Sequence, residues 1–133
     1  MPVGHEFTDQ RHVTFPQLAG RDLVTYRENS ALRHRLEQTL DDHGLSPRNA
    51  FICTEMGAVR ALVSKGMGIA VIPRSAAEEA GPPIELRPIG PQPFTWPVAL
   101  VWRGRRRQPP AAKAFLSLAI ARAQQAPPVR LAA

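Results

Sequence analysis

The stretch EMGAVRALVSKGMGIAVIP, residues 55–73, decides the fold of this chain. In its first half, apolar side chains recur at the spacing of one helix face: Met56, Val59, Leu62 and Val63. Gly66 stands where a left-handed residue ends the helix. Residues 69–72 are apolar without alternation, as in a strand covered on both faces of a parallel sheet, and Pro73 has no N–H to extend that strand. The stretch predicts a helix, a turn and a buried strand.

The preceding sequence continues this alternation. A strand is expected at residues 23–26, a helix at 31–43 that ends before Gly44, and a strand at 51–53. Residues 14–20 predict a short helical turn capped by Thr14 and closed by Gly20. Strand, helix, strand, helix and strand in succession imply right-handed crossovers and an α/β fold with a parallel sheet.

The last third of the chain is less regular. Residues 75–80 predict one helical turn and residues 84–89 an extended segment, and prolines make residues 90–97 a stiff connector. Residues 98–102, VALVW, predict a strongly apolar strand. Pro110 suits the first turn of a helix with an inward-facing set of side chains: Phe115, Leu116, Ala119 and Ile120.

Composition places the chain among globular proteins of one domain. Its 133 residues are 44% hydrophobic, and 17 basic against 11 acidic residues give a formal charge of +6. The tight basic cluster consists of Arg103, Arg105, Arg106 and Arg107. Such a cluster can attract phosphate, but no aromatic side chains alternate with it to stack bases, so we interpret it as a solvated loop after a strand.

Several classes of protein and site are disfavoured by what the sequence contains. Cys53 is the single cysteine and is expected in the core, so no disulfide framework is predicted. We find no apolar run of membrane-spanning length and no signal-peptide pattern, which predicts a cytoplasmic chain without a membrane partner. The sequence has no phosphate-cradling glycine loop, nucleophile elbow or metal-spaced His/Cys set. We therefore expect no enzymatic activity, cofactor or metal.

Candidate ligand-binding residues follow the predicted strands, because ligands of open α/β sheets gather beyond the carboxyl ends of strands. The first group, Asn29, Ser30 and Ala31, begins a helix whose N–H groups favour an anion. The Ser30 hydroxyl has two alternative roles there, as a ligand contact or as a helix cap. The other groups are Thr54, Glu55 and Met56, alternatively ordinary helix initiation, and Arg74 with Ser75, alternatively a solvated surface.

Four segments resemble, in the same order, the effector-binding domain of LysR-type transcriptional regulators: residues 13–24, 29–44, 61–73 and 100–116. The resemblance covers nearly the whole chain after residue 12. It implies an α/β fold like that of type II periplasmic binding proteins. Residues 1–21 would lead into the domain, 22–97 would form its second subdomain with the connector, 98–125 would be the returning strand and helix of the first subdomain, and 126–133 a tail.

The same resemblance implies a function. The chain would be the effector-binding part of a bacterial LysR-type regulator and would bind a small organic, anionic co-inducer. The sequence shows no counterpart of the family's winged helix-turn-helix, so we expect no specific DNA binding by this chain alone. A homodimer is expected because the strand at 98–102 would otherwise lack sheet partners. The alternatives are a stand-alone solute-binding or sequestering module and a nucleic-acid binder that uses the basic loop.

Overall fold

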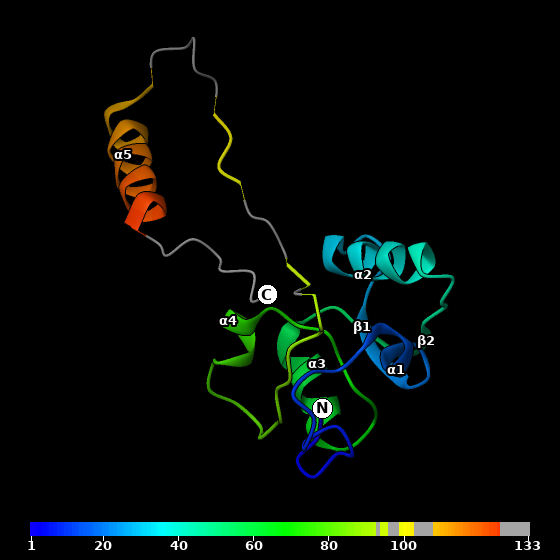
Figure 1. Ribbon diagram of the computed structural model, residues 1–133. Coiled ribbons are helices and arrows are strands. Elements are labelled where there is room, and N and C mark those ends of the chain that lie inside the picture. Colours follow the sequence, from blue (N-terminus) through cyan, green and yellow to red (C-terminus); the bar gives the residue numbers. More distant parts are fainter. Residues whose placement is uncertain (93, 96–98, 103–107, 126–133) are drawn as a thin grey trace. The chain divides into compact units, whose positions relative to one another are not determined.

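The computed structural model describes residues 1–92, 94–95, 99–102 and 108–125. The chain divides into two compact units, residues 1–96 and 97–133. The first unit contains, in chain order, α1 (Phe15–Ala19), β1 (Asp22–Tyr26), α2 (Ala31–Asp42), β2 (Arg48–Cys53), α3 (Met56–Ser64) and α4 (Arg74–Ala77). The second unit contains α5 (Pro110–Gln125). Figure 1 labels these elements.

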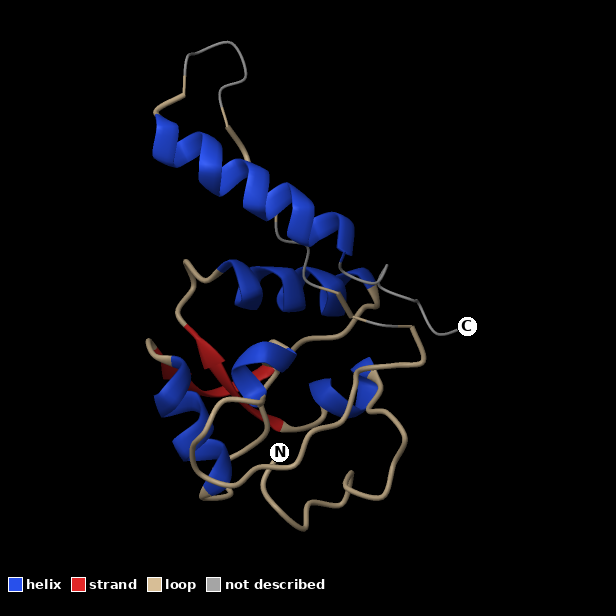
Figure 2. Ribbon diagram, turned by 90° about the vertical axis from the view of Figure 1, so that its left-hand side faces the viewer, coloured by secondary structure: helices blue, strands red, loops and turns tan. Residues whose placement is uncertain are grey.

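The first unit is built on a parallel pair of strands, β1 and β2, with α2 as the crossover between them. Figure 2 shows these strands in red, with helices on both sides of them. The register pairs Tyr26 with Cys53, so both strands end at the same edge of the sheet. The predicted α/β alternation up to α3 is therefore confirmed.

Side chains of β1 alternate between two hydrophobic clusters. Leu23 packs with residues from the N-terminal segment, α1, α2 and the stretch after α3: Phe7, Val13, Leu18, Leu36, Leu40 and Ile69. Val24 and Tyr26 pack instead with Cys53 and with Val59 and Val63 of α3. Because neighbouring strand residues point to opposite faces, β1 holds both halves of the core together. The burial of Cys53 confirms its expected place in the core.

Two glycines end α2 and α3, as the sequence predicts. Gly44 has φ 67° and Gly66 has φ 76°. In each case the glycine N–H donates to a carbonyl three residues earlier, and the N–H of the next residue donates to a carbonyl five residues earlier. This pair of bonds satisfies helix-end carbonyls and requires a left-handed residue, which glycine adopts without steric cost.

The strand predicted at residues 69–72 is mostly wrong. Only Ile69 pairs, in an isolated parallel bridge with Leu23. The expected extended segment at 84–89 also makes one such bridge, between Ile89 and Val13. Apolar composition favours a strand, but a ladder needs a neighbouring backbone, and residues 70–72 border a cavity instead. The helical turn expected at 75–80 forms slightly earlier, as α4.

In the second unit, α5 begins at Pro110 as predicted, but its apolar side chains are not covered. Phe115 and Ile120 are exposed, Leu116 is half-buried, and no described residue of α5 is buried. The strand expected at 98–102 is also wrong where it is described, because residues 99–102 form no ladder and are exposed. Val98 and the arginines at 103 and 105–107 lie outside the described residues.

Candidate functional site

The carboxyl ends of β1 and β2 bring two of the three predicted groups to one edge of the sheet. Residues 27–30 connect β1 to α2, and Thr54 and Glu55 connect β2 to α3. Since Tyr26 and Cys53 are register partners, these two connections leave the sheet beside each other (Figure 1). This is the edge at which open α/β sheets bind ligands.

Ser30 caps α2 through a long hydrogen bond. Its Oγ accepts from the backbone N–H of Arg33 at 3.5 Å, at the outer limit for such a bond. The Ser30 N–H itself donates to the carbonyl of Arg27 at 2.9 Å, which closes the connection into a turn. Asn29 and Ala31 are exposed, and Ser30 is half-buried. The capping role is therefore present, while the hydroxyl stays at an accessible edge.

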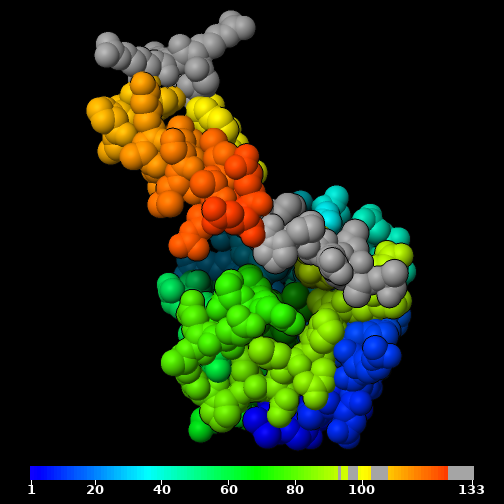
Figure 3. Space-filling model, turned by 60° about the vertical axis from the view of Figure 1, so that its left-hand side comes forward, coloured from blue at the N-terminus to red at the C-terminus, as the bar shows by residue number. Residues whose placement is uncertain are grey.

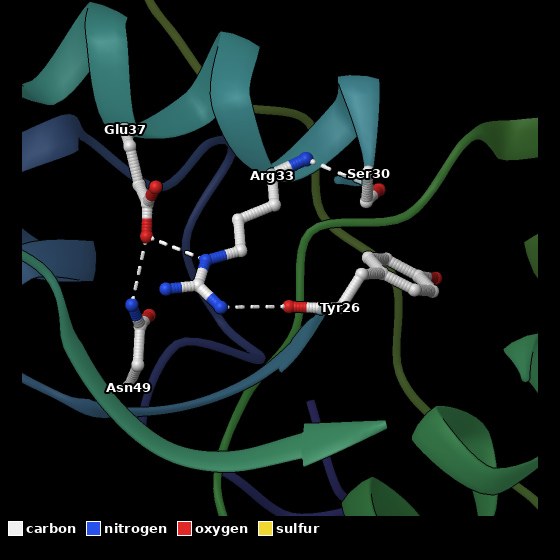
Figure 4. A network of polar contacts seen from close by, with 5 residues as sticks. All are labelled: Tyr26, Ser30, Arg33, Glu37 and Asn49. Carbon is white, nitrogen blue, oxygen red and sulfur yellow. Dashed lines mark hydrogen bonds and ion pairs between the residues drawn. The ribbon is translucent and has the colours of Figure 1, made fainter. Parts of the chain in front are cut away.

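A buried ionic network supports this helix start from below (Figure 4). The Arg33 side chain is only 10% exposed. Its Nη1 donates to the Tyr26 carbonyl oxygen at 3.1 Å, and its Nε donates to Glu37 Oε1 at 2.7 Å. Asn49 of β2 donates to the same Glu37 oxygen at 2.8 Å. The network joins α2 to both strands, and sequence analysis did not predict it, although Arg33 and Glu37 have the spacing of a helical ion pair.

The second group divides into two exposed residues and one packed residue. Thr54 and Glu55 are exposed, and the Glu55 side chain makes no capping bond at the start of α3. Met56 is half-buried in the cluster around Val59, where its Sδ accepts a hydrogen bond from the Tyr26 hydroxyl at 2.7 Å. Burial, and to a lesser degree Cys53, raises the pKa of Tyr26 to about 12. The Met56 side chain is thus engaged in the core.

The third group lies on α4. Arg74 and Ser75 are exposed, and Arg74 Nε is 3.8 Å from Glu78 Oε1 in an exposed ion pair. Arg74 also lines a cavity of about 480 Å³ in the first unit. It is the only one of the eight predicted site residues that does so. The structure therefore gathers the first two groups at the sheet edge and associates Arg74 with a different feature.

The cavity lies between two extended segments, residues 69–72 and 84–89, with α3 and α4 beside them. Figure 3 shows the face where the green surface of α3 and α4 meets the yellow-green surface of the later segment. Arg60 spans one wall. Its Nε donates to the Pro82 carbonyl, and its Nη1 donates to the carbonyls of Ala77 and Glu79, at 2.8 to 2.9 Å. No pattern in the sequence predicted this cavity.

A membrane-spanning helix and a metal site can be assessed over the parts of the chain that the structure describes. No helix there has the length and apolarity that a bilayer span requires. Within the same residues, no three His, Cys, Asp or Glu side chains come close enough together to hold a metal ion.

The comparisons with known proteins agree on one family. The family model described as the LysR substrate binding domain matches residues 1–124. In Bacillus subtilis, the HTH-type transcriptional regulator CysL is 28% identical over 74 residues, and the transcriptional dual regulator GltC is 28% identical over 82. The matches cover 56% and 62% of this chain but only 25% and 27% of those relatives. The chain thus spans about a quarter of the length of these relatives.

The fold agrees with a solved structure. HinK, a LysR family transcriptional regulator from Pseudomonas aeruginosa, superposes with a TM-score of 0.58 at 20% sequence identity. The superposition covers 88% of this chain and 41% of HinK. At this identity the likeness supports the fold alone.

Proposed function

The chain belongs to the LysR substrate-binding domain family, and on this premise we propose that it binds a small organic anion at the carboxyl ends of β1 and β2. The family has the α/β fold of type II periplasmic binding proteins, with a parallel sheet. The bound anion is the effector of a transcriptional regulator, and the proposal contains no catalytic step. A regulator of this kind works in the cytoplasm, where the proposal places the chain.

One observation carries the proposal: α2 and α3 both begin at the same sheet edge, and their first turns are poorly capped. Ser30 supplies only the 3.5 Å bond to α2, and Glu55 supplies no side-chain bond to α3. Free N–H groups and the positive ends of two helix dipoles favour a negatively charged ligand. A carboxylate bound there would satisfy donors from both helices.

The candidate residues have different roles in this proposal. Ser30 and Thr54 offer hydroxyls, and Asn29 offers an amide. Ala31, Glu55 and Met56 contribute backbone N–H groups, because an alkyl side chain, a carboxylate and a packed thioether cannot donate to an anion. Arg74 and Ser75 lie on the short α4, apart from the two helix starts, and we propose them as a separate contact point that offers a cation and a hydroxyl.

The test separates the capping role of Ser30 from its ligand role. Aspartate is also a good N-cap, so Ser30→Asp should preserve the stability of α2 while its charge repels an anion. A panel of small carboxylates is screened by thermal shift on the wild type, and the hits are repeated on Ser30→Asp, Ser30→Ala and the exposed-loop control Ser46→Ala. We expect the stabilisation to disappear in Ser30→Asp and to persist in Ser46→Ala. Hits that stabilise Ser30→Asp as strongly as the wild type would place the anion elsewhere.

The proposal includes a homodimer. Large apolar side chains of the second unit are exposed in the single chain: Leu100, Val101, Trp102, Phe115, Leu118 and Ile120. So many large exposed apolar side chains in one short unit favour their burial against a partner. Light scattering behind a sizing column should give twice the mass of one chain, and the mass of a monomer at all concentrations would contradict the dimer.

A further inference from the structure

Tyr26 bonds to the first turn of each of the two helices that begin at the proposed effector site. Its backbone carbonyl accepts from Arg33 Nη1 of α2 at 3.1 Å. Its hydroxyl donates at 2.7 Å to Sδ of Met56, the first residue of α3. Figure 4 shows the Tyr26 carbonyl directed toward Arg33 and the ring directed away from that network. The last residue of β1 therefore joins the starts of α2 and α3 by two different groups.

The Tyr26 side chain is held in the core. The residue is 9% exposed and packs with Val59 and Val63 of α3. Burial raises the pKa of the Tyr26 phenol to about 12, so the hydroxyl is protonated at neutral pH and can donate. A buried phenol needs an acceptor, and Met56 supplies it. Phenylalanine would fill the same space without this bond. The hydroxyl therefore adds a directional link to α3 that packing alone does not supply.

This link bears on the hydrogen-bond donors of the proposed site. The side chain and the backbone N–H of Met56 leave one residue, so holding the thioether also restricts the N–H. The first N–H groups of a helix have no partner within it and are the groups available to an anion. At the start of α2, the bond from Arg33 to Tyr26 restricts the first turn in the same way. Donors that are already in place bind an anion without the entropy cost of ordering them.

We propose that Tyr26 is a positioning residue of the effector site: its hydroxyl, through Met56, fixes the start of α3 relative to the start of α2. This inference rests on the proposed function and deepens it, because one small carboxylate reaches donors of both helices only if their separation is fixed. The ligand contacts the N–H groups and does not need to touch the phenol. Removal of the hydroxyl leaves the donors present but no longer held at one separation. Carboxylate affinity then falls while the fold remains.

The first test measures carboxylate affinity by isothermal titration calorimetry, with acetate, succinate and benzoate as probes. Tyr26→Phe removes the hydroxyl alone and should raise the dissociation constant of the tightest-binding probe at least about fivefold, the order of one hydrogen bond. Thr25→Val is the matched control, since Thr25 is the buried neighbour whose side chain points to the other face of the sheet. It should change the dissociation constant less than about twofold. Circular dichroism checks that both variants are folded at the titration temperature.

A double-mutant cycle tests whether the hydroxyl acts through Met56. Leucine keeps the packing of Met56 but cannot accept a hydrogen bond, so Met56→Leu should weaken binding about as much as Tyr26→Phe. The double variant should bind no more than about twofold more weakly than either single variant, because both changes break the same link. Losses that multiply in the double variant would overturn the proposal.

The single tyrosine of the chain also gives a spectroscopic readout. Labelling with 3-fluorotyrosine gives one fluorine NMR resonance, which reports on Tyr26. A saturating probe should shift this resonance in the wild type and in Thr25→Val, and should leave it in place in Ser30→Asp. A resonance that stays in place while calorimetry shows binding to the wild type would contradict the link. Binding that Tyr26→Phe leaves unchanged overturns this inference alone, whereas a wild type that binds none of the probes removes the effector site and this inference with it.

Discussion

Arg33 Nη1 lies 3.1 Å from the carbonyl oxygen of Tyr26, the last residue of β1. This contact ties the first turn of α2 to the strand that precedes it, directly beneath the connection formed by residues 27–30. The guanidinium also binds Glu37, which accepts from Asn49 of β2. One buried side chain therefore links α2 to the end of β1 and, through Glu37, to Asn49 near the start of β2.

Replacing Arg33 with methionine should destabilise the first unit by about 1–3 kcal/mol, the usual cost of losing buried hydrogen bonds to a charged group. Arg33→Lys should recover only part of this, because an ammonium group cannot reach two acceptors in the fixed geometry of a guanidinium. Urea unfolding measures the difference. Arg35→Met on the exposed side of α2 is the control, and equal effects at the two positions would show that the network does not hold the helix.

The single tyrosine of the chain makes its titration directly readable. Tyr26 should ionise at about pH 12, against 10.0 for an exposed phenol, mainly because it is buried. Because the pKa of Tyr26 is higher in the folded than in the unfolded chain, the stability contributed by the buried, protonated phenol is complete below pH 10. It is lost as the pH rises toward 12. Near-ultraviolet absorbance follows the phenolate. Met56→Ala should lower the midpoint and Met56→Leu should preserve it, and a midpoint near that of free tyrosine in the wild type would refute the burial argument.

Asp22 and Arg48 should give the first unit an acid-dependent contribution. The hydrogen bond that Arg48 Nε donates to Asp22 is the main cause that lowers the pKa of this carboxyl below 3.8. Because the pKa of Asp22 is lower in the folded than in the unfolded chain, the ion pair stabilises the folded state at pH values above the unfolded pKa. This stabilisation is lost as the pH falls through the folded pKa. Asp22→Asn should therefore be less stable than the wild type at neutral pH, with the gap closing below about pH 4. Asp42→Asn serves as the comparison, and a gap independent of pH would contradict the assignment.

Gly68 should tolerate no side chain. Its φ is 149°, and a Cβ would collide with the Asp22 carbonyl, the same oxygen that accepts from the Ile69 N–H. Gly68→Ala should cost about 1–3 kcal/mol by strain and by opening the bridge to β1. Gly57 lies in α3 with open space around its Cβ position, so Gly57→Ala should be neutral or stabilising by about 0.5–1 kcal/mol. Thermal unfolding of the two variants compares them, and a harmless Gly68→Ala would rule out the close approach.

The candidate site was predictable in part. A residue that follows a buried strand and begins a helix must lie at the carboxyl edge of a parallel sheet, which is why residues 29–31 and 54–56 come together. The order of strands and helices does not reveal that Met56 turns into the core toward Tyr26 or that Arg74 lines a cavity. The direction of a side chain and the width of a cavity depend on segments that are far apart in the sequence.

By itself, the sequence determined the local elements of the first unit: the apolar spacing of α3, the stops at Gly44 and Gly66, and the alternation from β1 to α3. These depend on contacts within a few residues, so a short stretch contains all the information they need. Only the tertiary structure decided that Ile69 pairs with β1 while residues 70–72 do not pair with a strand. It also decided that Arg33 is buried and that α5 presents Phe115 and Ile120 to solvent. An apolar run favours burial in general, but whether it becomes a strand depends on a neighbouring backbone being present to complete the ladder.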